Sequence, residues 1–216
     1  SRRSSAARRL AGAVRAWEEG LARNARTHTR RREGGRRAGP GRDSVAKHSG
    51  AEGMAIQNLR NIFRPESIAV VGASGRTESV GYTVLKNLIT AEFAGPVYPI
   101  NPNRDEVLGV AAHKTVGDLP TPPDLAVVCT RANLVPDVIR QCGEAGIVGL
   151  VVLSAGFREF GDEGKQLEAA LLAELRRWPN MRLIGPNCLG VLSPACRLNA
   201  SFARTMPNAG RVAFIS

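Results

Sequence analysis

A glycine-rich stretch is the part of the sequence best suited to hold a ligand. It reads Gly72-Ala-Ser-Gly-Arg-Thr-Glu-Ser-Val-Gly81 and lies between an apolar run and a segment with helical periodicity. Glycine lets a backbone turn tightly and approach a ligand, and the free amides at a helix start attract anions such as phosphate. We interpret the stretch as a nucleotide-binding loop, with an ordinary strand-to-helix turn as the alternative.

The loop departs from the G-x-G-x-x-G fingerprint of dinucleotide sites. Ser74 stands where the second glycine belongs, and five residues separate Gly75 from Gly81. An NAD site also needs an acidic residue after the second strand to bind the ribose hydroxyls. The chain instead has Asn101-Pro-Asn-Arg104 there. Arg104 favours a ligand with an additional ribose phosphate, such as CoA or NADP, and a solvated surface arginine is the alternative.

Short apolar runs alternate with helical segments from residue 67 onward, which is typical of strand–helix–strand units around a parallel sheet. The runs are continuously apolar, as expected for strands that are buried on both faces. We therefore predict an α/β fold with a Rossmann-like, doubly wound, mainly parallel sheet. The predicted strands lie within residues 67–74, 97–102, 125–130, 149–156 and 182–191.

Three amphipathic helices are predicted between these strands, because apolar residues recur at helical spacing in 80–89, 134–142 and 167–178. The third helix is expected to begin at Gly161–Asp162, with the Asp162 carboxylate accepting hydrogen bonds from first-turn amides. Gly143 and Gly146 are expected to mark the end of the second helix.

The positive charge is concentrated at the start of the chain. Of the net charge of +11, residues 1–53 carry +9 and the other 163 residues carry +2. We predict that 1–53 is an Arg-rich leader, either disordered or translated upstream of a natural start at Met54. A targeting presequence and a nucleic-acid-binding arm are the alternatives. Outside this leader, nucleic-acid binding is not expected, because the rest of the chain is nearly neutral.

The cysteine pattern and the hydropathy favour a cytoplasmic protein without a membrane segment. No C-x-x-C pair and no histidine at metal-ligand spacing accompanies the cysteines, so we expect reduced thiols and no metal site. The uncharged apolar stretch 145–157 is too short to cross a bilayer. The four cysteines are Cys129, Cys142, Cys188 and Cys196.

Four motifs, in the same order along the chain, give a family resemblance. They are FRPESIAVVGAS, VGYTVLKNL, VYPINPN and IGPNCLGV. With them, the sequence resembles the CoA-binding domain of the NDP-forming acyl-CoA synthetases, the family of the succinyl-CoA synthetase α subunit and ADP-forming acetate–CoA ligase. The resemblance runs from about residue 63 to 216. It implies a CoA-binding domain over 54–208, and the apolar stretch in 209–216 is expected to start a truncated second, succinyl-CoA ligase-like domain.

The resemblance also implies where CoA would bind. The family's contacts fall on the glycine loop, on a basic residue after the second strand and on the end of the fourth strand. Asn187 follows the fifth strand, where its amide would hold a thioester or phosphate oxygen or stabilise the turn. Cys188 beside it is expected to be a buried packing thiol rather than a nucleophile. The implied CoA contacts are Ser74, Gly75, Arg76, Val80, Gly81, Arg104, Leu153, Ser154 and Ala155.

The family's reaction converts acyl-CoA, ADP and phosphate into a carboxylic acid, CoA and ATP through a phosphorylated histidine. His28, His48 and His113 lack the motif around that histidine, so this chain is expected to hold no catalytic residue and to be inactive alone. ADP, ATP, phosphate and magnesium would bind through other domains, with an ATP-grasp domain or subunit as partner. The alternatives are the CoA-binding module of a protein acetyltransferase, a stand-alone CoA-binding or CoA-sensing protein, and an NAD(P)-dependent oxidoreductase.

Overall fold

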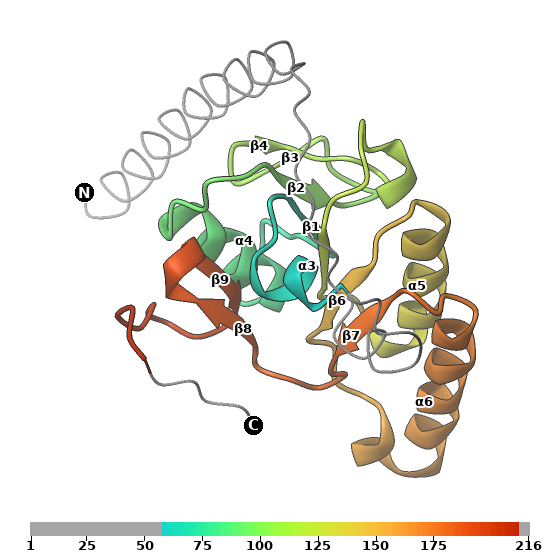
Figure 1. The fold of residues 1–216 in the computed structure, drawn as a ribbon. Coiled ribbons are helices and arrows are strands. Elements are labelled where there is room, and N and C mark those ends of the chain that lie inside the picture. Colours follow the sequence, from blue (N-terminus) through green and yellow to red (C-terminus); the bar gives the residue numbers. More distant parts are fainter. Residues whose placement is uncertain (1–57, 212–216) are drawn as a thin grey trace, which may run out of the picture.

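The apolar runs form a parallel sheet at the centre of the molecule (Figure 1). The computed structural model describes residues 58–211. Its main sheet has five strands in the order β2-β1-β5-β6-β7, and each neighbouring pair is parallel. The predicted α/β, Rossmann-like fold is therefore confirmed. The strands are β1 (Ile68–Val71), β2 (Val97–Ile100), β5 (Leu125–Val128), β6 (Gly149–Val152) and β7 (Arg182–Ile184).

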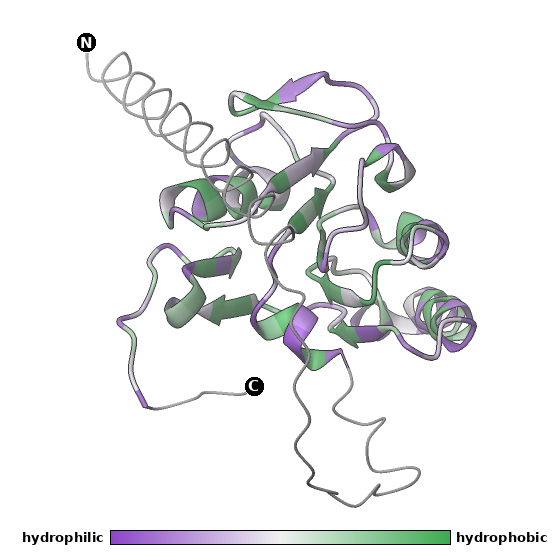
Figure 2. Ribbon diagram, turned by 45° about the horizontal axis from the view of Figure 1, so that its top comes forward, coloured by the Kyte–Doolittle hydropathy of each residue, from purple (hydrophilic) through white to green (hydrophobic). Residues whose placement is uncertain are grey.

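Helices cover both faces of this sheet. Helices α3 (Leu59–Phe63) and α4 (Val80–Thr90) pack on one face, and α5 (Val135–Glu144) and α6 (Gly161–Arg176) pack on the other. Successive residues of a strand point to opposite faces, so Val127 packs in the cluster with α4 and Val128 in the cluster with α5. Figure 2 shows hydrophobic residues concentrated in the central strands. The sheet is thus doubly wound.

The predicted strand over 182–191 is wrong in one respect, because the chain turns within it. Strand β7 ends at Ile184, and Gly185 then adopts a φ of +99° in a turn through Pro186 and Asn187. The next strand, β8 (Gly190–Ser193), pairs antiparallel with β9 (Leu198–Ser201) in a separate hairpin that packs near α4. A Gly-Pro pair inside an apolar run therefore divides it between two sheets.

The predicted helices are present, with one correction. Helix α6 begins at Gly161 as expected, but Asp162 does not cap it. Its carboxylate instead pairs with Lys165 one turn later, because Asp162 already lies inside the helix. The Glu159 carboxylate accepts from the amides of Gly156 and Phe157 just before the helix.

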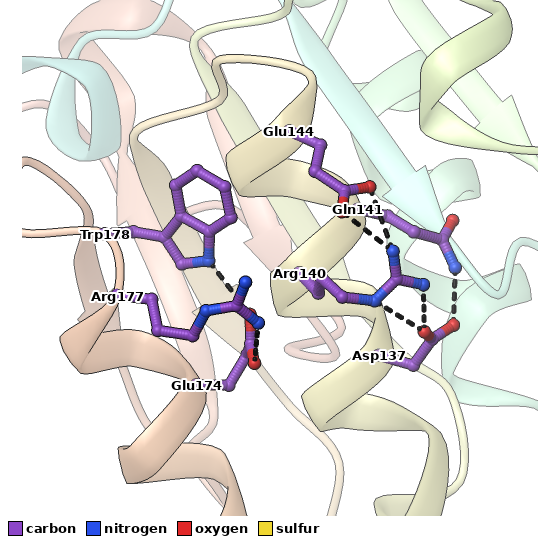
Figure 3. Close-up of polar contacts among 7 residues, drawn as sticks. All are labelled: Asp137, Arg140, Gln141, Glu144, Glu174, Arg177 and Trp178. Atoms are coloured by element: carbon purple, nitrogen blue, oxygen red, sulfur yellow. Dashed lines mark hydrogen bonds and ion pairs between the residues drawn. The ribbon is translucent and has the colours of Figure 1, made fainter.

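Polar networks lie along α5 and at the C-terminal end of α6 (Figure 3). Arg140 bridges Asp137 and Glu144 on α5, and Glu174 accepts from Arg177 and from the Trp178 indole on α6. The exposed ion pairs of α5 add little to stability. The Arg140 network therefore gives α5 a polar surface toward solvent. The Glu174 side chain is mostly buried, and its partner Trp178 packs beside Gly143 of α5.

The remaining elements are short. A small hairpin follows β2, and four 3₁₀ turns connect the larger elements. None of the helices in residues 58–211 has the length and apolarity needed to cross a bilayer. The short elements are β3 (Glu106–Val107), β4 (Val110–Ala111), η1 (Val116–Asp118), η2 (Ala132–Leu134), η3 (Arg158–Phe160) and η4 (Pro194–Cys196).

Two predictions lie outside the described residues. These are the Arg-rich leader over 1–53 and most of the strand expected near the end of the chain, at 212–216. The domain boundaries at 53/54 and 208/209 therefore stay predictions.

Candidate functional site

The strand order places a crevice beside β1. In chain order the sheet runs 2-1-3-4-5, so the connection after β1 leads to β2 on one side, whereas β5 lies on the other. Open α/β sheets bind ligands at such a switch point, outside the carboxyl ends of the strands. The segments that follow β1, β5 and β6 at this edge are the glycine loop, Cys129-Thr130 and 153–155.

Two glycines let the glycine loop approach the sheet closely. Gly72 has a φ of +86°, and a Cβ built on it would lie 3.0 Å from the backbone of Cys129. A Cβ on Gly81 would overlap the carbonyl oxygen of Gly72 and lie 2.9 Å from its carbonyl carbon. Glycine at position 81 is therefore required for α4 to pack against the end of β1, independently of any contact between its backbone and a ligand.

The first turn of α4 has two free amides, one on the exposed Val80 and one on the buried Gly81. The N-cap residue Ser79 accepts a hydrogen bond from the Tyr82 amide at 3.2 Å and donates to the Arg76 carbonyl at 2.8 Å. Ser74 Oγ accepts from the Arg76 amide at 3.1 Å. Within residues 58–211, the amides of Val80 and Gly81 have no hydrogen-bond partner. These amides and the positive end of the helix dipole suit a phosphate group.

Arg104 stands on a turn that is tied to the glycine loop. Asn101 Nδ2 donates to the Ala73 carbonyl at 2.7 Å, and Asn101 Oδ1 accepts from the Asn103 amide at 2.8 Å. The Arg104 side chain is exposed and forms no ion pair with any residue of 58–211. The turn that carries this unpaired cation is thus bound to Ala73 of the glycine loop.

A pocket of about 360 Å³ lies at the carboxyl ends of β5 and β6. It brings together five of the ten residues predicted to bind CoA. The other five lie outside its lining: Ser74, Gly75 and Arg76 on the loop after β1, Gly81 in the first turn of α4, and Arg104 on the loop after β2. The lining residues are Val80, Cys129, Thr130, Leu153, Ser154, Ala155, Asn187, Cys188, Leu189 and Phe202.

Hydrogen bonds join the strand ends that form this pocket. Ser154 Oγ donates to the Thr130 carbonyl at 2.7 Å, which links β6 to β5. The Asn187 amide donates to the Ser154 carbonyl at 3.0 Å, which links the turn after β7 to β6. Asn187 has a φ of +52° and is exposed, so its side-chain amide, unlike its backbone amide, is available to a ligand.

The two thiols in the pocket wall are neutral. Burial raises the pKa of Cys129 to about 12, and burial also raises the pKa of Cys188. Cys188 Sγ lies 3.3 Å from the Val152 carbonyl oxygen, to which it donates. A protonated thiol is a poor nucleophile, so the structure favours Cys188 as a packing group.

Five residues of the lining were not among the predicted contacts. Cys188 was expected only as a packing thiol, and sequence reasoning missed Cys129, Thr130, Leu189 and Phe202. Thr130 could have been found, because it ends a predicted strand and ligands bind at the carboxyl ends of parallel strands. Phe202 follows the β8–β9 hairpin, and no feature of the sequence places that hairpin beside the sheet.

A second hollow, of about 400 Å³, lies between η1 and α5, away from every predicted site residue. Gln141 and Glu144 in its wall already bind Asp137 and Arg140 (Figure 3). It offers no free polar group comparable with the α4 amides.

The fold and the switch-point loop define a nucleotide-binding α/β domain. A family model described as a CoA binding domain matches residues 66–194, which is more than half of the chain. The chain therefore belongs to this CoA-binding domain family.

Similar proteins are ADP-forming CoA ligases. An acetate–CoA ligase (ADP-forming) I of Archaeoglobus fulgidus is 41% identical over 73% of this chain and 23% of its own length. The α subunit of acetate–CoA ligase (ADP-forming) II of Pyrococcus furiosus is 44% identical over 73% of this chain and 34% of its own. A solved acetyl-coenzyme A synthetase 1 of Ca. Korarchaeum cryptofilum is 41% identical, with a TM-score of 0.63, over 67% of this chain and 30% of that one. The chain thus spans about a quarter to a third of these relatives.

Proposed function

We propose that this chain binds CoA at the carboxyl edge of its sheet, as the CoA-binding part of an ADP-forming acyl-CoA synthetase. The observation that carries the proposal is the pair of free amides at the start of α4, with the unpaired Arg104 on the adjoining turn. CoA combines a diphosphate, a ribose 3′-phosphate and an uncharged pantetheine arm. Helix amides and an arginine are the groups that bind phosphates in proteins.

Each predicted site residue has a role in this proposal. The loop residues Ser74, Gly75 and Arg76 and the amides of Val80 and Gly81 would surround the diphosphate. Arg104 would bind the 3′-phosphate, because it lies beyond the end of β2, where the ribose substituents of bound nucleotides are recognised.

The strand end after β6 would hold the remainder of the ligand. Leu153, Ser154 and Ala155 would line the pantetheine arm, since all three belong to the pocket wall. The exposed amide of Asn187 would bind a thioester or phosphate oxygen.

The complete synthetase reaction needs groups from beyond this domain. The matched relatives are named as ADP-forming ligases, and the chain covers only part of each. We therefore propose that ADP, ATP, phosphate and magnesium bind to an ATP-grasp domain or subunit, and that the phosphorylated histidine also lies outside this chain. The part described here would supply CoA in a fixed orientation.

Calorimetric titration of the 216-residue chain with CoA, NAD⁺ and NADP⁺ tests the proposal. About 0.2 M salt screens non-specific attraction of these anions to the basic chain. We expect CoA to bind at least about ten-fold more tightly than either dinucleotide, a difference of about 1.4 kcal/mol. Binding of NAD⁺ or NADP⁺ without binding of CoA would overturn the proposal in favour of an oxidoreductase.

A further inference from the structure

The pocket at the ends of β5 and β6 has no charged side chain in its wall. Its lining consists of apolar residues, two neutral thiols and the polar residues Thr130, Ser154 and Asn187. A phosphate that entered this pocket would lose its hydration without gaining a cation. The lining therefore suits an uncharged part of a ligand.

One residue of the pocket wall, Thr130, carries a buried hydroxyl that lacks a partner. Thr130 Oγ1 is inaccessible to solvent and forms no hydrogen bond with any residue of 58–211. Its methyl carbon Cγ2 is close to Gly72, at 3.1 Å from where a Cβ on that glycine would stand. The Ser154 hydroxyl binds the Thr130 carbonyl, which holds the backbone at this position. Buried polar groups without a partner are rare in folded proteins and call for an explanation.

The mouth of the pocket is apolar. Val80, Leu189 and Phe202 line it with side chains that are 40%, 63% and 39% exposed. Ligand pockets commonly combine such apolar surface with a few polar groups that orient the ligand. A ligand bound here would cover the exposed apolar rim and could also accept a hydrogen bond from the Thr130 hydroxyl.

We infer that Thr130 is a ligand-positioning residue, whose hydroxyl donates a hydrogen bond to a carbonyl oxygen of the uncharged arm of CoA. The inference rests on the proposed function and divides the ligand between two places. The phosphates stay at the α4 amides and Arg104, which lie outside the pocket. The arm, whose amide and thioester carbonyls are hydrogen-bond acceptors, enters between Val80 and Phe202 and reaches Thr130. Because Oγ1 is covered in the free structure, the Thr130 side chain has to rotate about χ1 to turn its hydroxyl toward the arm.

Two substitutions and two ligands test this division. Thr130→Val replaces the hydroxyl by a methyl group of similar size, and Thr130→Ser keeps the hydroxyl. The ligands are CoA and adenosine 3′,5′-bisphosphate, which has phosphates but no pantetheine arm. Calorimetry on the 216-residue chain should show that Thr130→Val weakens CoA binding roughly 5- to 30-fold, whereas Thr130→Ser changes it less than about 3-fold. Neither substitution should change the affinity for the bisphosphate.

Thermal unfolding without ligand separates this role from a structural one. Thr130→Val is expected to unfold at the same temperature as the wild type or higher, because it removes a buried hydroxyl that has no partner. An unchanged CoA affinity in Thr130→Val, or an equal loss for CoA and the bisphosphate, would overturn the inference and leave the proposed function standing. Failure of the wild-type chain to bind CoA would overturn both.

Discussion

Replacing Gly81 by valine is expected to lower the free energy of unfolding by about 3 kcal/mol or more. A Cβ at this position would overlap the Gly72 carbonyl oxygen, which belongs to backbone held by a hydrogen bond from the Gly72 amide to Ile100. The overlap is with main chain rather than with a flexible side chain, so α4 would have to move away from β1. The variant should therefore unfold at lower urea concentration, as measured by circular dichroism.

Gly75→Ala is the matched control in the same loop. No heavy atom lies within 4 Å of a Cβ built on Gly75, so we expect a change within about 0.5 kcal/mol. Equal stability of Gly81→Val and the wild type would contradict the close packing of α4 on β1. The comparison also bears on binding, because a loss of CoA affinity in Gly81→Val would follow from displacement of the helix and would not identify a ligand contact.

Replacing Arg104 by alanine is expected to weaken CoA binding roughly 10- to 100-fold, the usual effect of losing a charge-assisted hydrogen bond to a phosphate. The side chain is exposed and unpaired within residues 58–211, so its removal should leave the stability unchanged within about 0.5 kcal/mol. Calorimetry with CoA measures the effect, and urea unfolding measures the stability.

Two controls identify the phosphate that Arg104 binds. Arg176→Ala makes the same change in charge on α6, on the opposite face of the sheet from α4, and should leave CoA affinity within about 2-fold of the wild type. Dephospho-CoA lacks the 3′-phosphate, so Arg104→Ala should weaken its binding much less than that of CoA. Equal weakening of both ligands would show that Arg104 does not act on the 3′-phosphate.

The sheet could be predicted because its strands are buried on both faces. Val70 and Val71 lie in different apolar clusters, so both must be apolar and the run shows no alternation. The predicted strand over 182–191 failed because its apolar residues belong to two sheets, separated by a turn with positive φ at Gly185 and Asn187. The Asp162 cap failed because the residue lies one position inside the helix.

The site could be predicted only in part. Sequence motifs identified positions along the chain, and these positions fall into two places, the loops after β1 and β2 and the pocket beyond β5 and β6. Gly81 was expected to contact the ligand, but its lack of a side chain is explained by packing against Gly72. Phe202 could not be predicted, because it comes near Val80 only through the placement of a separate hairpin.

A crystal structure of the 216-residue chain with CoA tests the proposed binding site most directly. The diphosphate is expected within hydrogen-bond distance of the Val80 and Gly81 amides, and the 3′-phosphate within ion-pair distance of Arg104. The pantetheine arm should occupy the pocket and accept a hydrogen bond from Thr130. CoA bound elsewhere, for example in the hollow between η1 and α5, would contradict the proposed site.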